Sequence, residues 1–234
     1  MKVLMVDVGG TYVKMMAAGH EGFRKFPSGR KLTASKMAKC VLDATQDWEF
    51  EAVSIGFPGL VANGEPARDP LNLGGGWVGF NFEKAFKRPV RVINDAAMQA
   101  LANYQSGRML FLGLGTSIGA TLVADDIVIP IEVGGFRLSK SKGFADVLGK
   151  IARDDKGHKT WEKNVWRAVA FLRDCFWPDE VVLGGGNAKA LLEIQPGCRV
   201  RDNQDAFLGA QRLWPGADML AEPQATTWRI RHRK

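Results

Sequence analysis

Two segments of this chain share one plan, and that repeat restricts the fold more than any other feature. Residues 5–17, "MVDVGGTYVKMMA", and residues 111–123, "FLGLGTSIGATLV", both read as a strand, a turn of glycine and threonine, and a second strand. Glycines allow backbone angles that other residues avoid, and exposed N–H groups at such a turn form a nest for an anion. An ordinary β-hairpin also uses paired glycines. Two such hairpins, roughly a hundred residues apart, predict two related halves that face one another.

The rest of the chain alternates apolar strands with helices, which predicts an α/β fold. The strand candidates are residues 3–8, 52–57, 90–93, 109–114, 119–123 and 180–183. The helix candidates are roughly residues 33–46, 96–105, 160–176 and 204–213. A dinucleotide-binding fold is disfavoured, because the glycine spacing is not G-x-G-x-x-G and each turn leads into a strand. The terminal "WRIRHRK" is expected to be a loose end.

Composition limits the setting in which the protein works. Its three cysteines, Cys40, Cys175 and Cys198, are widely spaced and form no C-x-x-C pair, which indicates a reducing compartment. No secretion signal precedes the first strand, and no apolar stretch is long enough to span a bilayer. We therefore expect a cytoplasmic protein without a membrane partner.

The positive charge is concentrated in one part of the chain. The net charge is +7, and residues 137–167 hold nine basic side chains against four acidic ones. Such a stretch suits nucleic acid, phosphates or a long polyanion, while a solvated surface accounts for most of these side chains. Charge alone leaves these alternatives open.

A third glycine turn follows the long helix candidate. In "EVVLGGGNAKAL", residues 180–191, a strand runs into Gly184, Gly185 and Gly186, and a helix is expected to open at Asn187 or Ala188. Free N–H groups at a helix start and a surface without side chains suit a phosphate or a flat base. A tight strand-to-helix turn without a ligand is the alternative.

Asp95 is the candidate catalytic group. In "VRVINDAAMQALANY" a strand ends, Asn94 and Asp95 occupy the turn, and a helix begins at Ala96. An aspartate at this position commonly caps a helix. It would also lie beyond the carboxyl end of a strand, where open α/β sheets bind ligands. There its carboxylate is able to accept the proton of an attacking hydroxyl.

The order of these motifs resembles a known family. "DVGGTYVK", "FPGLV", "VINDA", "GLGTSIGATL", "EVGG" and "LGGGNAK" follow one another as in the ROK family of sugar kinases, within the actin/hexokinase superfamily, and most resemble its polyphosphate-glucokinase-like branch. The resemblance implies an actin-like, ribonuclease H-like fold with two lobes, a duplicated β-sheet core and a central cleft. It places the N-terminal lobe at residues 1–105 and the C-terminal lobe at 106–234, with the final segment packing back on the N-terminal lobe.

The resemblance also implies roles for the matched residues. Asp95 is the general base, and the sugar is held by Asn94, Asp95 and Glu132, and less directly by Gly59 and Asn72. Asp7 orients Mg²⁺ through water, and no zinc site is expected because the cysteine-rich motif of other members is missing. The residues implied to bind phosphate or the donor are Asp7, Gly9, Gly10, Thr11, Lys14, Gly115, Thr116, Gly184, Gly185, Gly186 and Asn187.

The implied activity is a sugar kinase reaction. A phosphoryl group passes from ATP or inorganic polyphosphate to a hexose hydroxyl, with glucose 6-phosphate as the expected product. The partners are then the sugar and the donor, with no nucleic acid, and a homodimer is compatible with the family. The alternative is a weak or inactive sugar-binding regulator, because Gly135 in "EVGG" stands where the family's E-x-G-H has a sugar-contacting histidine.

Overall fold

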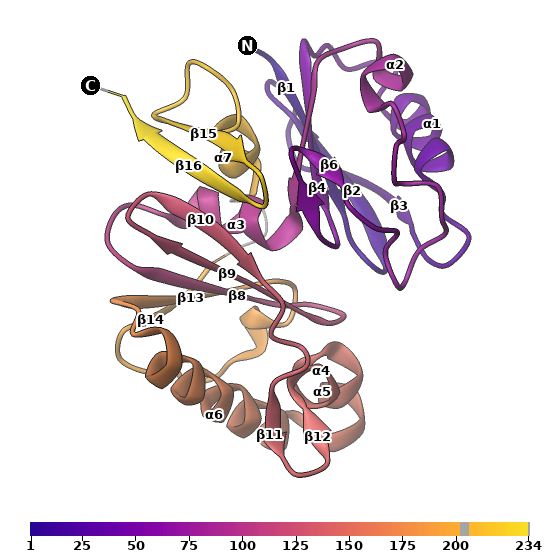
Figure 1. Ribbon diagram of the computed structural model, residues 1–234. Coiled ribbons are helices and arrows are strands. Elements are labelled where there is room, and N and C mark those ends of the chain that lie inside the picture. Colours follow the sequence, from indigo (N-terminus) through magenta and orange to yellow (C-terminus); the bar gives the residue numbers. More distant parts are fainter. Residues whose placement is uncertain (202–205, 234) are drawn as a thin grey trace.

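The computed structural model describes residues 1–201 and 206–233 and has two main β-sheets (Figure 1). The N-terminal sheet has five strands in the order β3-β2-β1-β4-β7, and the C-terminal sheet has seven in the order β14-β13-β8-β9-β10-β16-β15. Helix α3 (Asp95–Asn103) lies between the two sheets. Across the described ranges, no helix combines the length and the apolarity needed to cross a membrane.

The N-terminal sheet is covered on both faces. Its strands are β1 (Val3–Val8), β2 (Tyr12–Ala17), β3 (Arg24–Pro27), β4 (Ala52–Phe57) and β7 (Val90–Asn94). Helices α1 (Ala34–Ala44) and α2 (Phe82–Phe86) belong to this lobe, with the small ladder of β5 (Val61–Ala62) and β6 (Glu65–Pro66). Successive residues of a strand point to opposite faces. Leu4 and Val6 therefore pack with α1, while Val3 and Met5 pack with α3.

The C-terminal sheet is covered by different helices on its two faces. Its strands are β8 (Met109–Leu114), β9 (Ile118–Ala124), β10 (Ile127–Ile131), β13 (Glu180–Gly184), β14 (Cys198–Val200), β15 (Met219–Gln224) and β16 (Thr227–His232). Helix α6 (His158–Phe176) buries the expected stripe, including Trp161, Val165 and Leu172, against one face. The remaining elements are α4 (Phe144–Leu148), α5 (Lys150–Lys156), α7 (Ala206–Gln211), the 3₁₀ turn η1 (Ala188–Ala190), and the ladder of β11 (Arg137–Ser139) and β12 (Lys142–Gly143).

The segment that follows α7 is bonded to the N-terminal sheet. Trp214 Nε1 donates to Ser54 Oγ at 2.8 Å, and Ser54 Oγ donates to the carbonyl of Ala210 at 2.8 Å. The guanidinium of Arg91 lies 4.7 Å from the centre of the Trp214 ring. Because each half of the chain carries its own sheet, we propose the division at residues 1–105 and 106–234 as that of the two lobes.

Most expected elements are present, and two expectations were wrong. All six expected strands and the helices at 33–46, 96–105 and 160–176 have counterparts; the helix at 204–213 corresponds to α7, and residues 204 and 205 lie outside the described residues. The tail is not loose, because residues 227–232 form β16, in which Trp228 and Ile230 are buried while Arg229 and Arg231 point outward. The third glycine turn opens only a three-residue 3₁₀ turn instead of a helix.

Candidate active site

A cavity of about 680 Å³ lies between the two hairpins and holds almost every expected site residue. These cavity-lining residues are Asp7, Gly9, Gly10, Thr11, Lys14, Gly59, Asn72, Asn94, Asp95, Gly115, Thr116, Glu132, Gly185, Gly186 and Asn187. Residues more than a hundred positions apart thus share one site. Gly184 does not line this cavity.

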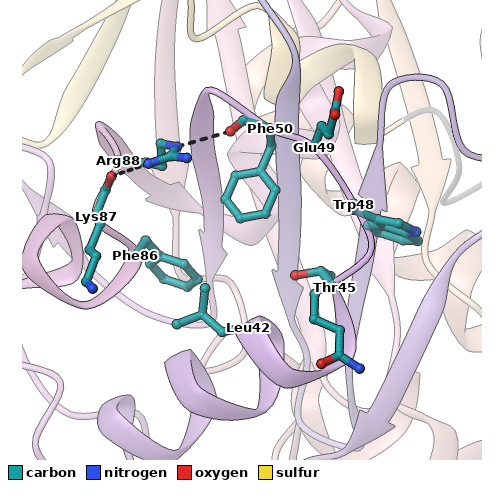
Figure 2. A pocket seen from close by; sticks show the side chains of 9 residues that line it. Leu42, Thr45, Trp48, Glu49, Phe50, Phe86, Lys87 and Arg88 are labelled. Atoms are coloured by element: carbon teal, nitrogen blue, oxygen red, sulfur yellow. Dashed lines mark hydrogen bonds between the residues drawn. The ribbon is translucent and has the colours of Figure 1, made fainter.

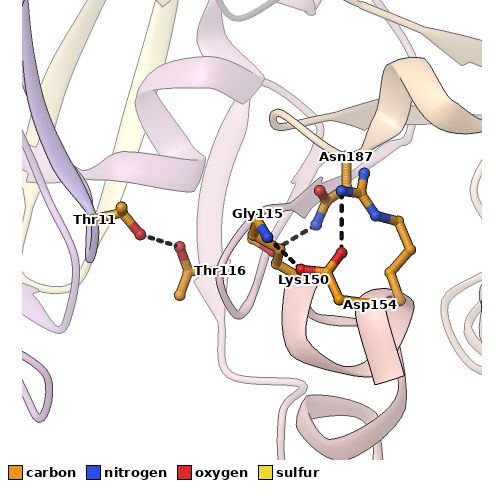
Figure 3. A network of polar contacts seen from close by, with 7 residues as sticks. Thr11, Gly115, Thr116, Lys150, Asp154 and Asn187 are labelled. Atoms are coloured by element: carbon orange, nitrogen blue, oxygen red, sulfur yellow. Dashed lines mark hydrogen bonds and ion pairs between the residues drawn. The ribbon is translucent and has the colours of Figure 1, made fainter. Parts of the chain in front are cut away.

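The two glycine turns touch at their tips. Thr11 Oγ1 and Thr116 Oγ1 lie 2.9 Å apart, within hydrogen-bond distance (Figure 3). A Cβ placed on Gly10 would lie 3.9 Å from the side chain of Thr116. The two turns therefore face each other from the two lobes, as the sequence repeat predicts.

Two of the expected phosphate-binding glycines, Gly9 and Gly115, use their N–H groups within the turns. The Gly9 N–H donates to the carbonyl of Tyr12 at 3.0 Å, and the Gly115 N–H donates to the carbonyl of Ser117 at 3.0 Å, so both glycines close their turns. The backbone N–H groups of the next two residues in each turn are open: within residues 1–201 and 206–233 they have no hydrogen-bond acceptor. These residues are Gly10 and Thr11 in the first turn and Thr116 and Ser117 in the second. Ser117 was not anticipated, because its position in the turn becomes clear only from this bonding pattern.

The third glycine turn has a structural task. A Cβ on Gly184 would lie 2.6 Å from the Phe111 ring, and one on Gly185, whose φ is +84°, would lie 2.5 Å from the Leu114 carbonyl oxygen. Both glycines let β13 close against β8. The buried Asn187 donates from its backbone N–H to the Leu114 carbonyl at 2.9 Å and from Nδ2 to the Gly115 carbonyl at 2.8 Å (Figure 3). The amide of Asn187 thus holds the second hairpin turn in place.

Two glycines also bring the start of α3 close to both sheets. A Cβ on Gly56 in β4 would lie 2.5 Å from Met98 Cε and 3.4 Å from Asp95 Cα. A Cβ on Gly119 in β9 would lie 3.0 Å from Ala96 Cβ. Because these positions carry no side chain, Asp95 is held where the two lobes meet.

Asn94, and not Asp95, caps helix α3. Asn94 Oδ1 accepts the N–H of Ala97 at 3.1 Å, and Asn94 Nδ2 donates to the carbonyl of Gly59 at 3.1 Å. Asp95 is the first helical residue, and its Oδ1 accepts the N–H of Ala96 at 2.8 Å. The capping alternative for Asp95 is therefore removed, and Asn94 has a positioning role through Gly59.

The surroundings of Asp95 favour its protonated form. Burial, followed by the negative charges of Asp7 and Glu132, raises the pKa of Asp95 from 3.8 to about 7. Burial also raises the pKa of Asp7, an effect that the charge of Lys14, its cross-strand partner, offsets in part. A carboxylate with a pKa near neutrality is suited to accept a proton at physiological pH.

This pKa leads to a testable pH dependence. Only an ionised carboxylate accepts a proton. With Asp95 as the general base that the family resemblance implies, turnover is expected to fall about tenfold for each pH unit below about 7 and to level off above it. The measurement is the pH profile of kcat/KM for the hexose. A profile that stays flat down to pH 5 would exclude Asp95 as a titrating base.

Two cations at the cavity come from the basic stretch. Lys150 and Arg153 on α5 line the cavity, and the backbone N–H of Lys150 donates to the Gly115 carbonyl at 3.0 Å. Both side chains form ion pairs with Asp154 (Figure 3). The sequence identified residues 137–167 as basic but did not indicate which members reach the site, because that depends on where α5 lies.

The connection at residues 58–80 forms part of the cavity wall. Arg68, Pro70, Leu71 and Asn72 line the cavity from this segment. Asp69 holds the segment in shape, because its carboxylate accepts the N–H of Trp77 at 2.8 Å and that of Gly76 at 3.2 Å. The Trp77 side chain is fully buried.

Gly135 stands apart from the cavity lining. A Cβ on Gly135 would meet no atom within 4 Å, so the missing side chain leaves open space. Glu132, three residues earlier, is exposed and lines the cavity.

A smaller hollow lies elsewhere on the N-terminal lobe. It measures about 400 Å³ and lies where α1 and α2 end, with Trp48, Phe50 and Phe86 in its wall (Figure 2). Arg88 Nε donates to the Phe50 carbonyl at 3.2 Å. None of the expected site residues lines it, so we assign the chemistry to the larger cavity.

The fold is that of the actin-like sugar kinases. The structure superposes on an inorganic polyphosphate/ATP-glucomannokinase from Arthrobacter sp. strain KM with a TM-score of 0.73, at 22% identity, over 89% of this chain and 96% of that one. A ROK-family transcriptional regulator, a homologue of the E. coli MLC protein, shares the fold with a TM-score of 0.67, at 16% identity, over 89% of this chain and 76% of that one.

Sequence comparison agrees with this class. The model of the ROK family matches residues 3–134, which is more than half of the chain, and the chain therefore belongs to the ROK family. A polyphosphate glucokinase from Mycobacterium tuberculosis (strain CDC 1551 / Oshkosh) is 25% identical over 206 residues, covering 77% of this chain and 76% of the relative.

Proposed function

We propose that the protein is a hexose kinase that transfers a phosphoryl group from ATP or inorganic polyphosphate to a sugar hydroxyl, with glucose 6-phosphate as the expected product. The observation that carries the proposal is the meeting of two amide-lined turns and Asp95 in one cavity. Similarity to a polyphosphate glucokinase and to a polyphosphate/ATP-glucomannokinase supports this donor pair.

Asp95 performs the proton transfer in this proposal. As the acceptor hydroxyl oxygen forms a bond to phosphorus, the bond between phosphorus and the donor's bridging oxygen breaks, and Asp95 takes the hydroxyl proton. Such a base contributes typically ~10²–10⁴-fold in rate. Positioning and charge neutralisation supply most of the remainder in phosphoryl transfer.

The turns hold the donor. The open N–H groups of Gly10, Thr11, Thr116 and Ser117, with the two threonine hydroxyls, surround a place for phosphate oxygens. Lys150 and Arg153 extend positive charge along the same wall. A long polyanion would use these cations more fully than a nucleotide, so polyphosphate turnover should decline more steeply with salt than ATP turnover.

Mg²⁺ fits this site through Asp7. Protein sites for Mg²⁺ commonly use one or two carboxylates together with substrate phosphates and water. Asp7 lines the cavity beside the first turn, and among residues 1–201 and 206–233 no cluster of three or more metal-ligating side chains offers a separate site. When bound, the ion would neutralise charge on the donor phosphates.

The acceptor side is assigned to residues of the N-terminal lobe and to Glu132. Asn72 reaches the cavity from the connection that Asp69 holds, and Asn94 fixes the carbonyl of Gly59. Glu132 approaches from the C-terminal lobe. Together these groups offer amide, carbonyl and carboxylate partners to sugar hydroxyls.

A coupled enzyme assay for glucose 6-phosphate, with ATP and with polyphosphate as donors, tests the proposed function. Turnover with at least one donor is expected, and a panel of other hexoses tests the acceptor. If no donor supports turnover of any hexose while glucose still binds in calorimetry, the kinase proposal fails and the regulatory alternative takes its place.

A further inference from the structure

The side chain of Gln99 is unpaired beside the cavity. Its carboxamide has no hydrogen-bond partner among residues 1–201 and 206–233, although the residue is partly buried and lines the same cavity as Asp95. Its backbone carbonyl, by contrast, accepts from Asn103 Nδ2 at 2.9 Å. Residues four apart share one face of a helix, so Gln99 lies one turn of α3 beyond Asp95 on the cavity side.

The carboxamide of Gln99 lies near the glycine that ends β13 and near the Phe111 ring. Gln99 Oε1 lies 3.4 Å from where a Cβ on Gly184 would stand, at the end of β13. Gly113, at the end of β8, pairs with Gly184 and lines the cavity. Gln99 therefore lies beside two strand ends of the C-terminal sheet, those of β8 and β13.

The chemistry of a carboxamide fits this place. The neighbouring carboxylates, Asp7 and Asp95, are both negative when ionised, and a phosphate chain between them and the turns needs hydrogen-bond donors. The Nε2 group of a glutamine supplies two N–H donors without a charge. A cation at position 99 would instead favour ionisation of Asp95 and lower its pKa.

We propose that Gln99 binds the phosphoryl donor, with Nε2 donating to an oxygen of the phosphate next to the one that is transferred. This inference rests on the proposed function and adds to it a donor-selecting side chain. Asp95 and Gln99 then have different roles on the cavity face of α3: Asp95 accepts the proton of the sugar hydroxyl, and Gln99 binds the phosphoryl donor.

The test compares Gln99→Leu and Gln99→Glu with the wild type in steady-state kinetics and in calorimetric titration with inorganic tripolyphosphate. Gln99→Leu is expected to raise the donor KM and the tripolyphosphate Kd about 10–150-fold, the effect of one hydrogen bond to a charged group. Gln99→Glu should weaken both further, because it adds a negative charge. The hexose KM should stay within about twofold. Gln46→Leu is the control and should leave the donor KM and Kd unchanged, because Gln46 is exposed and lines the smaller hollow instead of the cavity.

The outcomes separate this inference from the proposed function. Unchanged donor KM and Kd in both variants, or a rise confined to the hexose KM, would overturn the role of Gln99 while leaving the kinase intact. If the wild type shows no turnover, the titration with tripolyphosphate still tests whether Gln99 binds phosphate. Weaker binding in the variants supports Gln99 as a phosphate ligand, and equal binding overturns that role. If thermal unfolding shows that Gln99→Leu does not fold, the same two measurements on Gln99→Glu, which has almost the same shape as the wild type, decide between these outcomes.

Discussion

Replacing Asp95 by asparagine is expected to lower kcat by about 10²–10⁴-fold and to leave the sugar and donor KM values nearly unchanged. The variant keeps the shape of the side chain and an oxygen that is able to accept the N–H of Ala96, so helix α3 should begin as before. What it loses is the capacity to take the hydroxyl proton. Initial rates with saturating donor and hexose measure the effect, and full activity in the variant would show that the base assignment is wrong.

The same variant should be more stable than the wild type at pH 8, by more than about 1 kcal/mol. The pKa of Asp95 is about 7 in the folded protein and near 3.8 when unfolded. Between these values the folded state holds a proton that the unfolded state has released, so this group's contribution to stability falls as pH rises. Above pH 7 the folded protein carries a disfavoured carboxylate, which asparagine removes. Urea unfolding measures the difference, and a destabilised variant would point to a structural role for Asp95 instead.

Replacing Gly209 by alanine is expected to destabilise the protein by about 3 kcal/mol or more, at or beyond the upper end for added methyl groups in packed sites. A Cβ there would lie 1.9 Å from the Met98 carbonyl oxygen, so α7 would have to move away from α3. That movement would also disturb the carbonyl of Ala210 that Ser54 bonds. Urea unfolding of Gly209→Ala gives the value.

Gly135→Ala is the matched control for this prediction. The new methyl group would meet no atom within 4 Å, so the free energy of unfolding should change by less than about 0.5 kcal/mol. Equal stability of the two variants would contradict the close packing of α7 on α3.

The two hairpins could be predicted from the sequence because their pattern lies within a few consecutive residues. Glycine turns between apolar strands predict β1–β2 and β8–β9, and the stripe of α6 follows from helical spacing. The residue that caps α3 was less certain. Asn94 and Asp95 are both good capping residues, and only the backbone path decides which one caps.

Other features of the site depend on tertiary contacts that a sequence does not display. The structural roles of Gly184 and Asn187 depend on how β13 packs against β8, which the sequence does not show. Lys150 reaches the cavity only because α5 packs beside the second turn. The strand β16 was missed because its alternating pattern is short and rich in arginine. Gln99 carried no signal, since an exposed and an unpaired glutamine look alike in a sequence.

Chemical-shift titration of the backbone amides with tripolyphosphate tests the central claim, that both hairpin turns bind one phosphate chain. The amides of Gly10, Thr11, Thr116 and Ser117 have no protein acceptor in the described part of the chain and are expected to shift together with a single Kd. A response from one turn alone, or two turns that saturate at different concentrations, would contradict the account.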